Sequence, residues 1–377
     1  MGSFWVAIHT GEKVSTKKVL QINLLDNFRN WNYITHDQEV ISLYEKYKSN
    51  SADISVYYDH KQAVLAFSSR FYFDIGYHID EKKVLERPTG KGLHYQFPRL
   101  NSNFWSVKEY RGYWPNIRSG NSPMVINLLQ ANQGYNLVDS KYKVIWSYIN
   151  PLRFHFTDTP VIWARNRICA IGSENKEELL YLFSILNSSI VNRILLSQLK
   201  SEYEKDLLVS TSSIKQYVRV PPITRKNKHI KKEIIKRTEE LLALEEKTLS
   251  DFVDFSGVLV QKLDDVQVAG DTLVLVHGNR ETNLPIQGDI KLVAGTIAEK
   301  FGTEGLKLEK HQITLSELRN LQVIDFEKQA KLKDYIDDLV FTLYFKIRLK
   351  EVGLDKSEEI QKDCSKSKYY QLCKRSQ

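Results

Sequence analysis

The chain has 377 residues, a hydrophobic content of 42% and a formal net charge of +8. This length allows two or three domains. No run of residues approaches the ~18 consecutive apolar residues that a membrane span needs. The three cysteines form no CxxC pair of the kind that zinc fingers use. We therefore expect a cytoplasmic protein with no membrane contact, no disulfide framework and an anionic partner, nucleic acid first.

Residues 1–53 mix polar and aromatic side chains without a strong period. Within them, Val40, Leu43, Tyr44 and Tyr47 recur at helical spacing and predict a short amphipathic helix. The abrupt opening reads as if a preceding domain were absent, so we interpret this segment as the junction to a missing catalytic domain.

From residue 54 to about residue 170, short apolar runs alternate with polar loops rich in Gly, Pro, Asn and Arg. Four runs dominated by β-branched and aromatic residues predict strands: Ile54–Tyr57, Ala63–Phe67, Phe71–Phe73 and Val144–Trp146.

Two of the loops carry residue types that bind DNA. Arginine and asparagine can form paired hydrogen bonds with base edges, aromatic rings can stack or wedge, and glycines let a loop approach the phosphate backbone. The loop Arg87–Asn103 contributes the candidates Lys91, His94, Arg99 and Asn101. The loop Lys108–Pro123 contributes Arg111, Tyr113, Trp114, Asn116 and Arg118. The alternative is that both loops are simply solvated, with tyrosine and tryptophan packed beneath them.

The stretch from Val161 to Ile223 organises the rest of the chain. It begins with two strand-like runs, Val161–Ala164 and Ile168–Ile171, which flank the further DNA-binding candidates Arg165 and Arg167. A long central helix follows, because its apolar residues recur every three or four positions: Leu179, Leu182, Phe183, Leu186, Ile190 and Ile194.

Two features mark this helix. Asn175 is expected to cap its start, with Glu178 in the capping-box position. Asn187, Ser188 and Ser189 interrupt an otherwise favourable helical sequence. These small polar residues either let a neighbouring backbone approach closely or form a family signature.

A basic segment, Lys200–Arg237, comes next and contains few acids. Such a stripe can follow a row of phosphates, although a solvated helix face is the alternative. We take five of its residues as DNA-binding candidates: Lys200, Lys215, Arg225, Lys226 and Lys228.

The C-terminal part reads as a helix (Asn227–Leu249), a small β-rich unit (Phe252–Ile324), a second amphipathic helix (Phe326–Lys350) and a polar, basic tail that we expect to be frayed. Ala269–Gly270–Asp271 separates two alternating runs and predicts a hairpin. The fold class is therefore α+β, with a mixed β-rich recognition domain, a long central helix, further helices and a small β-rich unit. The predicted segments are 1–53, 54–225, 226–356 and 357–377.

The sequence lacks the residue patterns that several kinds of catalysis require. The nine histidines form no HxH or HxxxH pair and no GxSxG elbow occurs, so neither a metal site nor a serine nucleophile is expected. Glu204–Lys205 and Glu245–Lys247 contain the acidic residues and lysine that a nuclease centre needs. They lie in highly charged, helical surroundings, which indicates surface residues. Asn150-Pro151-Leu152-Arg153 keeps only half of the Asn-Pro-Pro-aromatic turn that adenine methylation needs. We therefore expect no methyl transfer by this chain alone.

Four phrases, in order, resemble the C-terminal specificity region of TaqI-type adenine-specific DNA methyltransferases, which is also present in type IIG restriction–modification fusions. They are Tyr142–Trp146, Ile185–Ser188, Ile214–Ile223 and Ile336–Tyr344, although Phe345 stands where that family has glycine.

The resemblance implies a DNA target-recognition region that reads double-stranded DNA for a methyltransferase catalytic domain or subunit. It also implies that S-adenosylmethionine binds to that partner and that no cofactor binds to this chain. The helices near 227–249 and 326–350 would pack together and meet the partner. The alternatives are a fragment of an active type IIG methyltransferase–endonuclease, a divergent nuclease of phage defence, and an interaction protein that binds no nucleic acid.

Overall fold

The computed structural model describes residues 3–10, 13–20, 38–54, 71–74, 85–87, 94–115, 136–151, 153–164, 167–199, 206–301 and 313–374. It is an α+β structure of helices and small, antiparallel sheets. The chain forms two compact units, unit 1 (Met1–Thr238 and Asp334–Gln377) and unit 2 (Glu239–Lys333). Unit 2 is thus inserted into the sequence of unit 1. This division does not follow the predicted segment boundaries, and the roles expected for those segments stay predictions.

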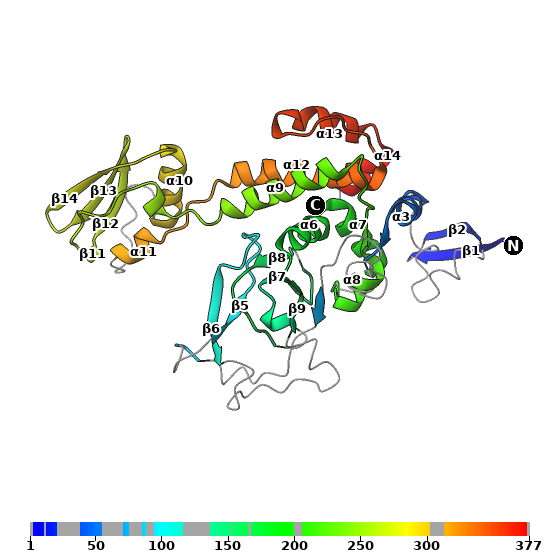
Figure 1. The fold of residues 1–377 in the computed structure, drawn as a ribbon, viewed down its shortest axis with the longest axis horizontal. Helices are drawn as coiled ribbons and strands as arrows, with labels where there is room; N and C mark the ends of the chain where they lie inside the picture. Colours follow the sequence, from blue (N-terminus) through cyan, green and yellow to red (C-terminus); the bar gives the residue numbers. More distant parts are fainter. Residues whose placement is uncertain are drawn as a thin grey trace. The chain divides into compact units, whose positions relative to one another are not determined.

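The described elements follow one another as shown in Figure 1. Those that belong wholly to unit 1 are β1 (Ser3–Thr10), β2 (Lys13–Leu20), α3 (Gln38–Asn50), β3 (Ala52–Asp53), β4 (Tyr72–Asp74), β5 (His94–Arg99), β6 (Glu109–Pro115), β7 (Tyr142–Ser147), β8 (His155–Thr157), β9 (Ile168–Ser173), α6 (Lys176–Leu186), α7 (Ser189–Leu199), α8 (Thr211–Tyr217), β10 (Arg219–Val220), η4 (Leu354–Lys356), α13 (Ser357–Ser365) and α14 (Lys368–Lys374).

The elements wholly in unit 2 are η3 (Leu249–Asp251), β11 (Lys262–Leu263), β12 (Asp265–Ala269), β13 (Thr272–His277), β14 (Arg280–Pro285), α10 (Ile290–Phe301), β15 (Ile313–Thr314) and α11 (Leu315–Arg319). The unit boundaries fall inside two long helices, α9 (Lys228–Ala243) and α12 (Phe326–Phe345). The amphipathic helices predicted at 40–47, 227–249 and 326–350 are confirmed as α3, α9 and α12.

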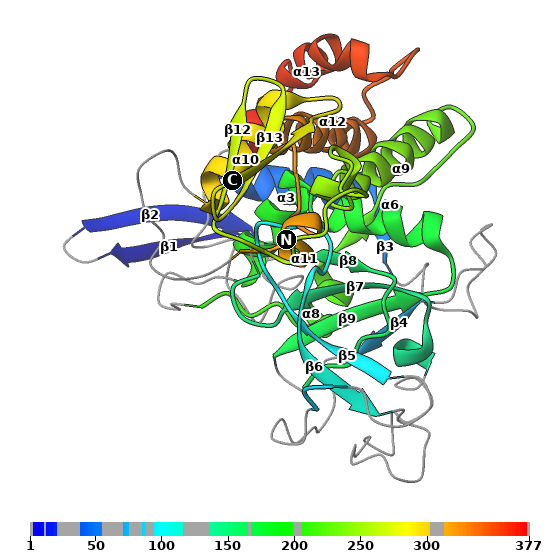
Figure 2. The ribbon, with the colours of Figure 1, turned by 90° about the vertical axis from the view of Figure 1, so that its left-hand side faces the viewer.

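A four-stranded antiparallel sheet with the order β4-β9-β7-β8 forms the centre of unit 1, and Figure 2 shows its strands side by side. All six residues of β9 and the middle four of β7 are buried, as expected for strands covered on both faces. Helix α6 packs against β7, β8 and β9. The strands predicted at Phe71–Phe73, Val144–Trp146 and Ile168–Ile171 are confirmed. The runs Ile54–Tyr57 and Ala63–Phe67 lie outside the described residues, apart from Ile54.

The run Val161–Ala164 is buried but is no strand, which corrects the prediction. Its end residues, Val161 and Ala164, form isolated bridges, and that of Val161 is parallel and pairs it with Gln96. Backbone hydrogen bonds link it to β5, because Gln96 N donates to Pro160 O (2.8 Å) and Ile162 N donates to Gln96 O (3.0 Å). The run therefore anchors β5 to the core instead of extending the sheet.

The central helix is interrupted, whereas the periodicity predicted one continuous helix. It consists of α6 and α7, which meet at an angle of 60° around Asn187 and Ser188. The Asn187 side chain accepts a hydrogen bond from Phe154 N (3.0 Å) and donates one to Phe154 O (3.2 Å). The interpretation that these polar residues allow close approach of a neighbouring backbone is confirmed. Asn175 caps α6 through Glu178 N (3.1 Å), but the Glu178 carboxylate pairs with Lys231, so no capping box forms.

The tail predicted to be frayed is ordered, and this prediction was wrong. Residues 357–374, which we call the C-terminal clasp, form α13 and α14. Lys374 Nζ lies 2.7 Å from Asp337 Oδ2 and 3.2 Å from Asp338 Oδ1, while Tyr370 donates to Asp338 (2.7 Å). Asp337 Oδ1 in turn accepts Ser189 N (2.7 Å) at the first residue of α7. Buried carboxylates thus join α7, α12 and the clasp.

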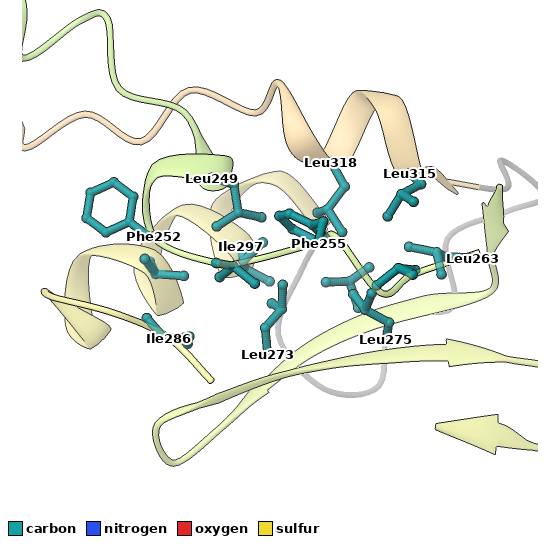
Figure 3. Packing of buried hydrophobic residues seen from close by; sticks show 14 of the residues in the cluster. Leu249, Phe252, Phe255, Leu263, Leu273, Leu275, Ile286, Ile297, Leu315 and Leu318 are labelled. Carbon is teal, nitrogen blue, oxygen red and sulfur yellow. The ribbon is translucent and has the colours of Figure 1, made fainter. Parts of the chain in front are cut away.

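Unit 2 has a hydrophobic core of its own (Figure 3). Leu273 and Leu275 of β13, Ile297 of α10 and Leu318 of α11 are all at most 3% exposed within it. The hairpin predicted around Gly270 is confirmed, because β12 and β13 are antiparallel neighbours and Gly270 adopts a φ of +63°, a conformation that glycine tolerates best.

No single described helix is long and apolar enough to cross a membrane. The α6–α7 pair meets the length and composition test only as two helices bent against each other, and most of its residues are buried.

Candidate nucleic-acid interface

The first part of the candidate interface is a β-hairpin, where loops were predicted. Strands β5 and β6 are antiparallel, and their register pairs Tyr95 with Trp114 and Arg99 with Glu109. The register shifts between Gln96 and Pro98, where Gly112 of the facing strand has a φ of +153°. Such a bulge bends a strand and re-aims its side chains. Paired strands therefore carry side chains that were expected on loops.

Two arginines project from this hairpin. Arg99 and Arg111 are both exposed. The Arg111 guanidinium carbon lies 4.1 Å from the centroid of the Phe97 ring, and that ring is itself only 1% exposed. A cation placed over an aromatic face is held there by electrostatic attraction to the ring. Arg111 is thus a positioned cation at the surface.

The aromatic candidates of the hairpin lie deeper. Trp114 is 0% exposed in a core cluster with Tyr95 and Trp163, so its ring cannot stack on a base in this structure. This corrects its place among the DNA-binding candidates, and the alternative of an aromatic residue packed beneath the surface holds for it. Tyr113 is half-buried, and its backbone pairs with Leu85 (2.8 and 2.9 Å).

Asn101 has a structural position. Its side chain donates to Glu109 Oε1 (2.6 Å) and accepts from Asn103 N (3.0 Å), while its backbone carbonyl accepts from Phe104 N (3.1 Å). These bonds organise the turn that leads from β5 towards β6. Both polar ends of the side chain are therefore engaged within the protein.

The second part of the interface is the turn before α9. Thr224 N donates to Asn227 Oδ1 (2.6 Å), Asn227 Nδ2 donates to Pro222 O (3.1 Å), and Lys226 N donates to the Thr224 hydroxyl (3.3 Å). Polar side chains bonded to nearby backbone in this way stabilise a turn. The turn holds Arg225 and Lys226, both exposed, at the start of α9.

A row of lysines continues along α9. Lys228, Lys232 and Lys236 are exposed and recur every four residues, so they lie on one face. We call these three and the preceding Arg225 and Lys226 the basic stripe. Within the part of the chain that the structure describes, no stripe residue has an ion-pair partner, whereas Lys231 pairs with Glu178 and Arg237 with Glu233.

This arrangement is unfavourable for the isolated protein. Cations near a helix N-terminus oppose the helix dipole by roughly 0.3–1 kcal/mol each, and like charges four residues apart cost roughly 0.2–0.5 kcal/mol per pair. A row of anions placed against the stripe would remove both penalties. The stripe therefore has the electrostatics of a phosphate-binding surface.

Two other lysines of the basic segment have different surroundings. Lys231 is 7% exposed, and burial lowers its pKa although Glu178 opposes this. Lys215, a predicted DNA contact, is partly buried with its ammonium 5.0 Å from the centroid of the Phe73 ring.

The remaining candidates divide as follows. Arg167 is exposed at the start of β9, and its backbone carbonyl accepts from Tyr148 N (2.9 Å). His94 begins β5, but its side chain is not described. Five candidates lie outside the described residues: Lys91, Asn116, Arg118, Arg165 and Lys200. Lys232 and Lys236 were missed as individual candidates, although their spacing of four and eight residues from Lys228 was a usable signal.

The incomplete methylation turn has a structural use. Asn150 has a φ of +45°, and its side chain donates to Asp206 Oδ1 (2.6 Å) and accepts from Leu207 N (2.6 Å). It fastens the end of β7 to the segment before α8. Among the described residues, no group of three or more His, Cys, Asp or Glu side chains is placed to hold a metal ion.

No family model and no curated protein matches the chain. Among solved structures, the type IIG restriction endonuclease BpuSI is similar over 89% of this chain and 37% of its own, with a TM-score of 0.37 and 12% identity. The S subunit of a type I restriction–modification system from M. genitalium is similar over 81% of this chain and 93% of its own, with a TM-score of 0.27 and 12% identity. The chain thus spans little more than a third of the endonuclease, and at these TM-scores neither similarity decides what the chain does.

Proposed function

We propose that this chain is the sequence-specific DNA recognition module of a restriction–modification system. In this proposal it guides an adenine-specific methyltransferase that binds S-adenosylmethionine, and it lacks the methyl-transfer motifs itself. The observation that carries the proposal is the basic stripe, whose five exposed cations have no acidic partner among the described residues. The four phrases that resemble the TaqI-type specificity region support the choice of system.

The two parts of the interface have different tasks in this proposal. The stripe binds phosphates, which supplies affinity without sequence information. The β5–β6 hairpin reads bases, because a two-stranded ribbon fits the major groove and arginine pairs with guanine there. Arg99 and Arg111 are the described arginines of the hairpin, and the Phe97 ring fixes the position of Arg111.

The phosphate contacts are tested by the triple substitution Lys228→Gln, Lys232→Gln and Lys236→Gln. Affinity for any duplex should fall, and the slope of log K against log salt should decrease by about 0.9 per lost phosphate contact. Fluorescence anisotropy of a labelled 20-bp duplex at several salt concentrations measures both.

The matched control for the stripe is Lys328→Gln, Lys331→Gln and Lys366→Gln, since these lysines are also exposed but each has an acidic neighbour. It should leave the slope unchanged. Equal slopes for the stripe variant and the wild-type chain would remove the observation on which the proposal rests.

Base reading is tested by Arg111→Ala. The wild-type chain first selects preferred duplexes from a random pool, and the variant is then compared on preferred and random duplexes. The preference should fall by about 1–3 kcal/mol, as for loss of one bidentate contact. A variant that loses the same affinity on both kinds of duplex would make Arg111 a phosphate contact and not a base reader.

A further inference from the structure

The N-terminal ribbon formed by β1 and β2 has no part in the proposed duplex interface. Each strand has eight residues, and all eight pairs are in register from Ser3–Leu20 to Thr10–Lys13. At about 3.3 Å per residue the ribbon is about 26 Å long. A two-stranded ribbon has no hydrophobic core of its own. An apolar side chain that is exposed on it therefore does not stabilise the fold through burial.

Trp5 is such a side chain. It is 68% exposed, the highest value for any tryptophan that the structure describes, whereas Trp105, Trp114, Trp146 and Trp163 are at most 7% exposed. Tryptophan is a large apolar residue that proteins ordinarily bury or use at an interface. Its ring is therefore available to a flat ligand.

The neighbours of Trp5 are cationic and polar. The register places Lys18 directly opposite Trp5 and Thr16 opposite Ala7, so Trp5, Lys18 and Thr16 share one face of the ribbon. Lys18 and Thr16 are exposed as well. The two strands contain Lys13, Lys17 and Lys18 but no aspartate or glutamate. Between the two strands the sequence has one acid, Glu12, so the ribbon combines an exposed tryptophan ring with a net positive charge.

We propose that this ribbon binds a single-stranded segment of nucleic acid, with an unpaired base stacked on Trp5 and a neighbouring phosphate at Lys18. Proteins that bind single strands combine aromatic rings, on which bases stack, with cations along the backbone. A paired base in a duplex offers no free face, so the site favours unpaired bases. The site is separate from the basic stripe and goes beyond the duplex recognition proposed above.

The alternative is structural, because cross-strand pairs of aromatic and long side chains also stabilise ribbons. Two substitutions at one position separate these roles. Trp5→Phe keeps a flat ring that can stack, while Trp5→Val keeps an apolar strand former without a ring. A stacking site distinguishes the two variants, whereas a role in strand formation does not.

The experiment measures binding of the full chain to a fluorescein-labelled 15-nucleotide oligothymidine strand and to a 20-bp duplex by anisotropy. Trp5→Val should weaken single-strand binding by roughly 5- to 150-fold, as for loss of one stacked base, and Trp5→Phe should retain most of it. Lys18→Gln should reduce the salt slope on the single strand by about 0.7. Leu259→Ala, at a side chain that is 90% exposed in unit 2, is the control and should change nothing.

A second readout needs no loss of affinity. The iodide-quenchable tryptophan emission that Trp5→Phe removes should become protected when the oligothymidine binds. The proposal is overturned if the wild-type chain does not bind the single strand, if Trp5→Val binds it as the wild type does, or if Phe and Val weaken it equally. A triple stripe variant that loses the duplex yet keeps the single strand leaves the ribbon site standing, so the two proposals fail separately.

Discussion

His155 shows how burial at one residue sets a response to pH. Its side chain lies in β8 and is 3% exposed, and its Nδ1 atom has no hydrogen-bond partner among the described atoms. Burial, with the nearby Arg153 in support, lowers the pKa of His155 from 6.5 to about 4. The imidazole is therefore neutral in the folded chain at neutral pH.

The sign of the pH effect follows from this difference. As the pH falls below 6.5 the unfolded chain takes up the proton first, so stability is complete above pH 6.5 and is lost between pH 6.5 and 4, by up to about 3 kcal/mol. In His155→Gln, the free energy of unfolding, measured with urea across this range, should depend less steeply on pH. His277→Gln, at a histidine whose side chain is 52% exposed, is the control. Unchanged steepness in the His155 variant would contradict the assignment.

At the residue scale, charge was a better guide to the interface than aromatic character. Because they are charged, Arg99, Arg111, Arg225, Lys226 and Lys228 were expected at the surface, and all five are exposed in the structure. The sequence could not separate Trp114 from a surface aromatic, because tryptophan serves both cores and interfaces. Its burial depends on partners such as Trp163 that lie far along the chain.

At the scale of elements, the C-terminal clasp is held by charge as well as by packing. Phe341 and Tyr370 pack edge to face (5.2 Å between centroids), and Phe345 stacks on Tyr369 (5.2 Å). Burial alone would lower the pKa of Lys374, but Asp337 and Asp338 more than offset this and raise it. Both carboxylates are at most 4% exposed, and among the described residues Lys374 is the cation that pairs with both.

Substituting that lysine should therefore loosen the clasp. Lys374→Met leaves Asp337 and Asp338 without their cation and should destabilise unit 1 by about 3 kcal/mol, the lower end for a broken buried pair, since Lys374 is one-fifth exposed. Chemical denaturation of the full chain measures the change. Lys366→Met breaks a pair with Asp363 that is largely exposed and should cost less than about 1 kcal/mol. Equal losses in the two variants would show that the clasp does not depend on the buried charges.

The elements that the sequence predicted well are those fixed by local pattern. Helices α3, α9 and α12 and the β12–β13 hairpin follow from apolar spacing and turn residues within one segment. The elements it missed depend on distant contacts. The bend after α6 needs the backbone of Phe154, 33 residues from Asn187, and the order of the clasp needs Asp338, 32 residues from Tyr370.

At the scale of the whole molecule, the chain forms two units with separate cores, and one unit is inserted within the sequence of the other. The predicted segments were drawn where the composition changes. The boundaries between the two units fall inside α9 and α12, and neither helix contains the glycine, proline or serine of a typical linker. A nested unit bounded by helices therefore leaves no linker signature for sequence reasoning to find.

The bond between Ser189 and Asp337 has a consequence for biosynthesis. The two residues are 148 positions apart, with all of unit 2 between them. At about 5–20 residues per second, a ribosome needs roughly 7–30 s to progress from one to the other. During that interval the first residue of α7 lacks its hydrogen bond to the Asp337 carboxylate. The apolar side of the helix must meanwhile be kept from binding to other polypeptides.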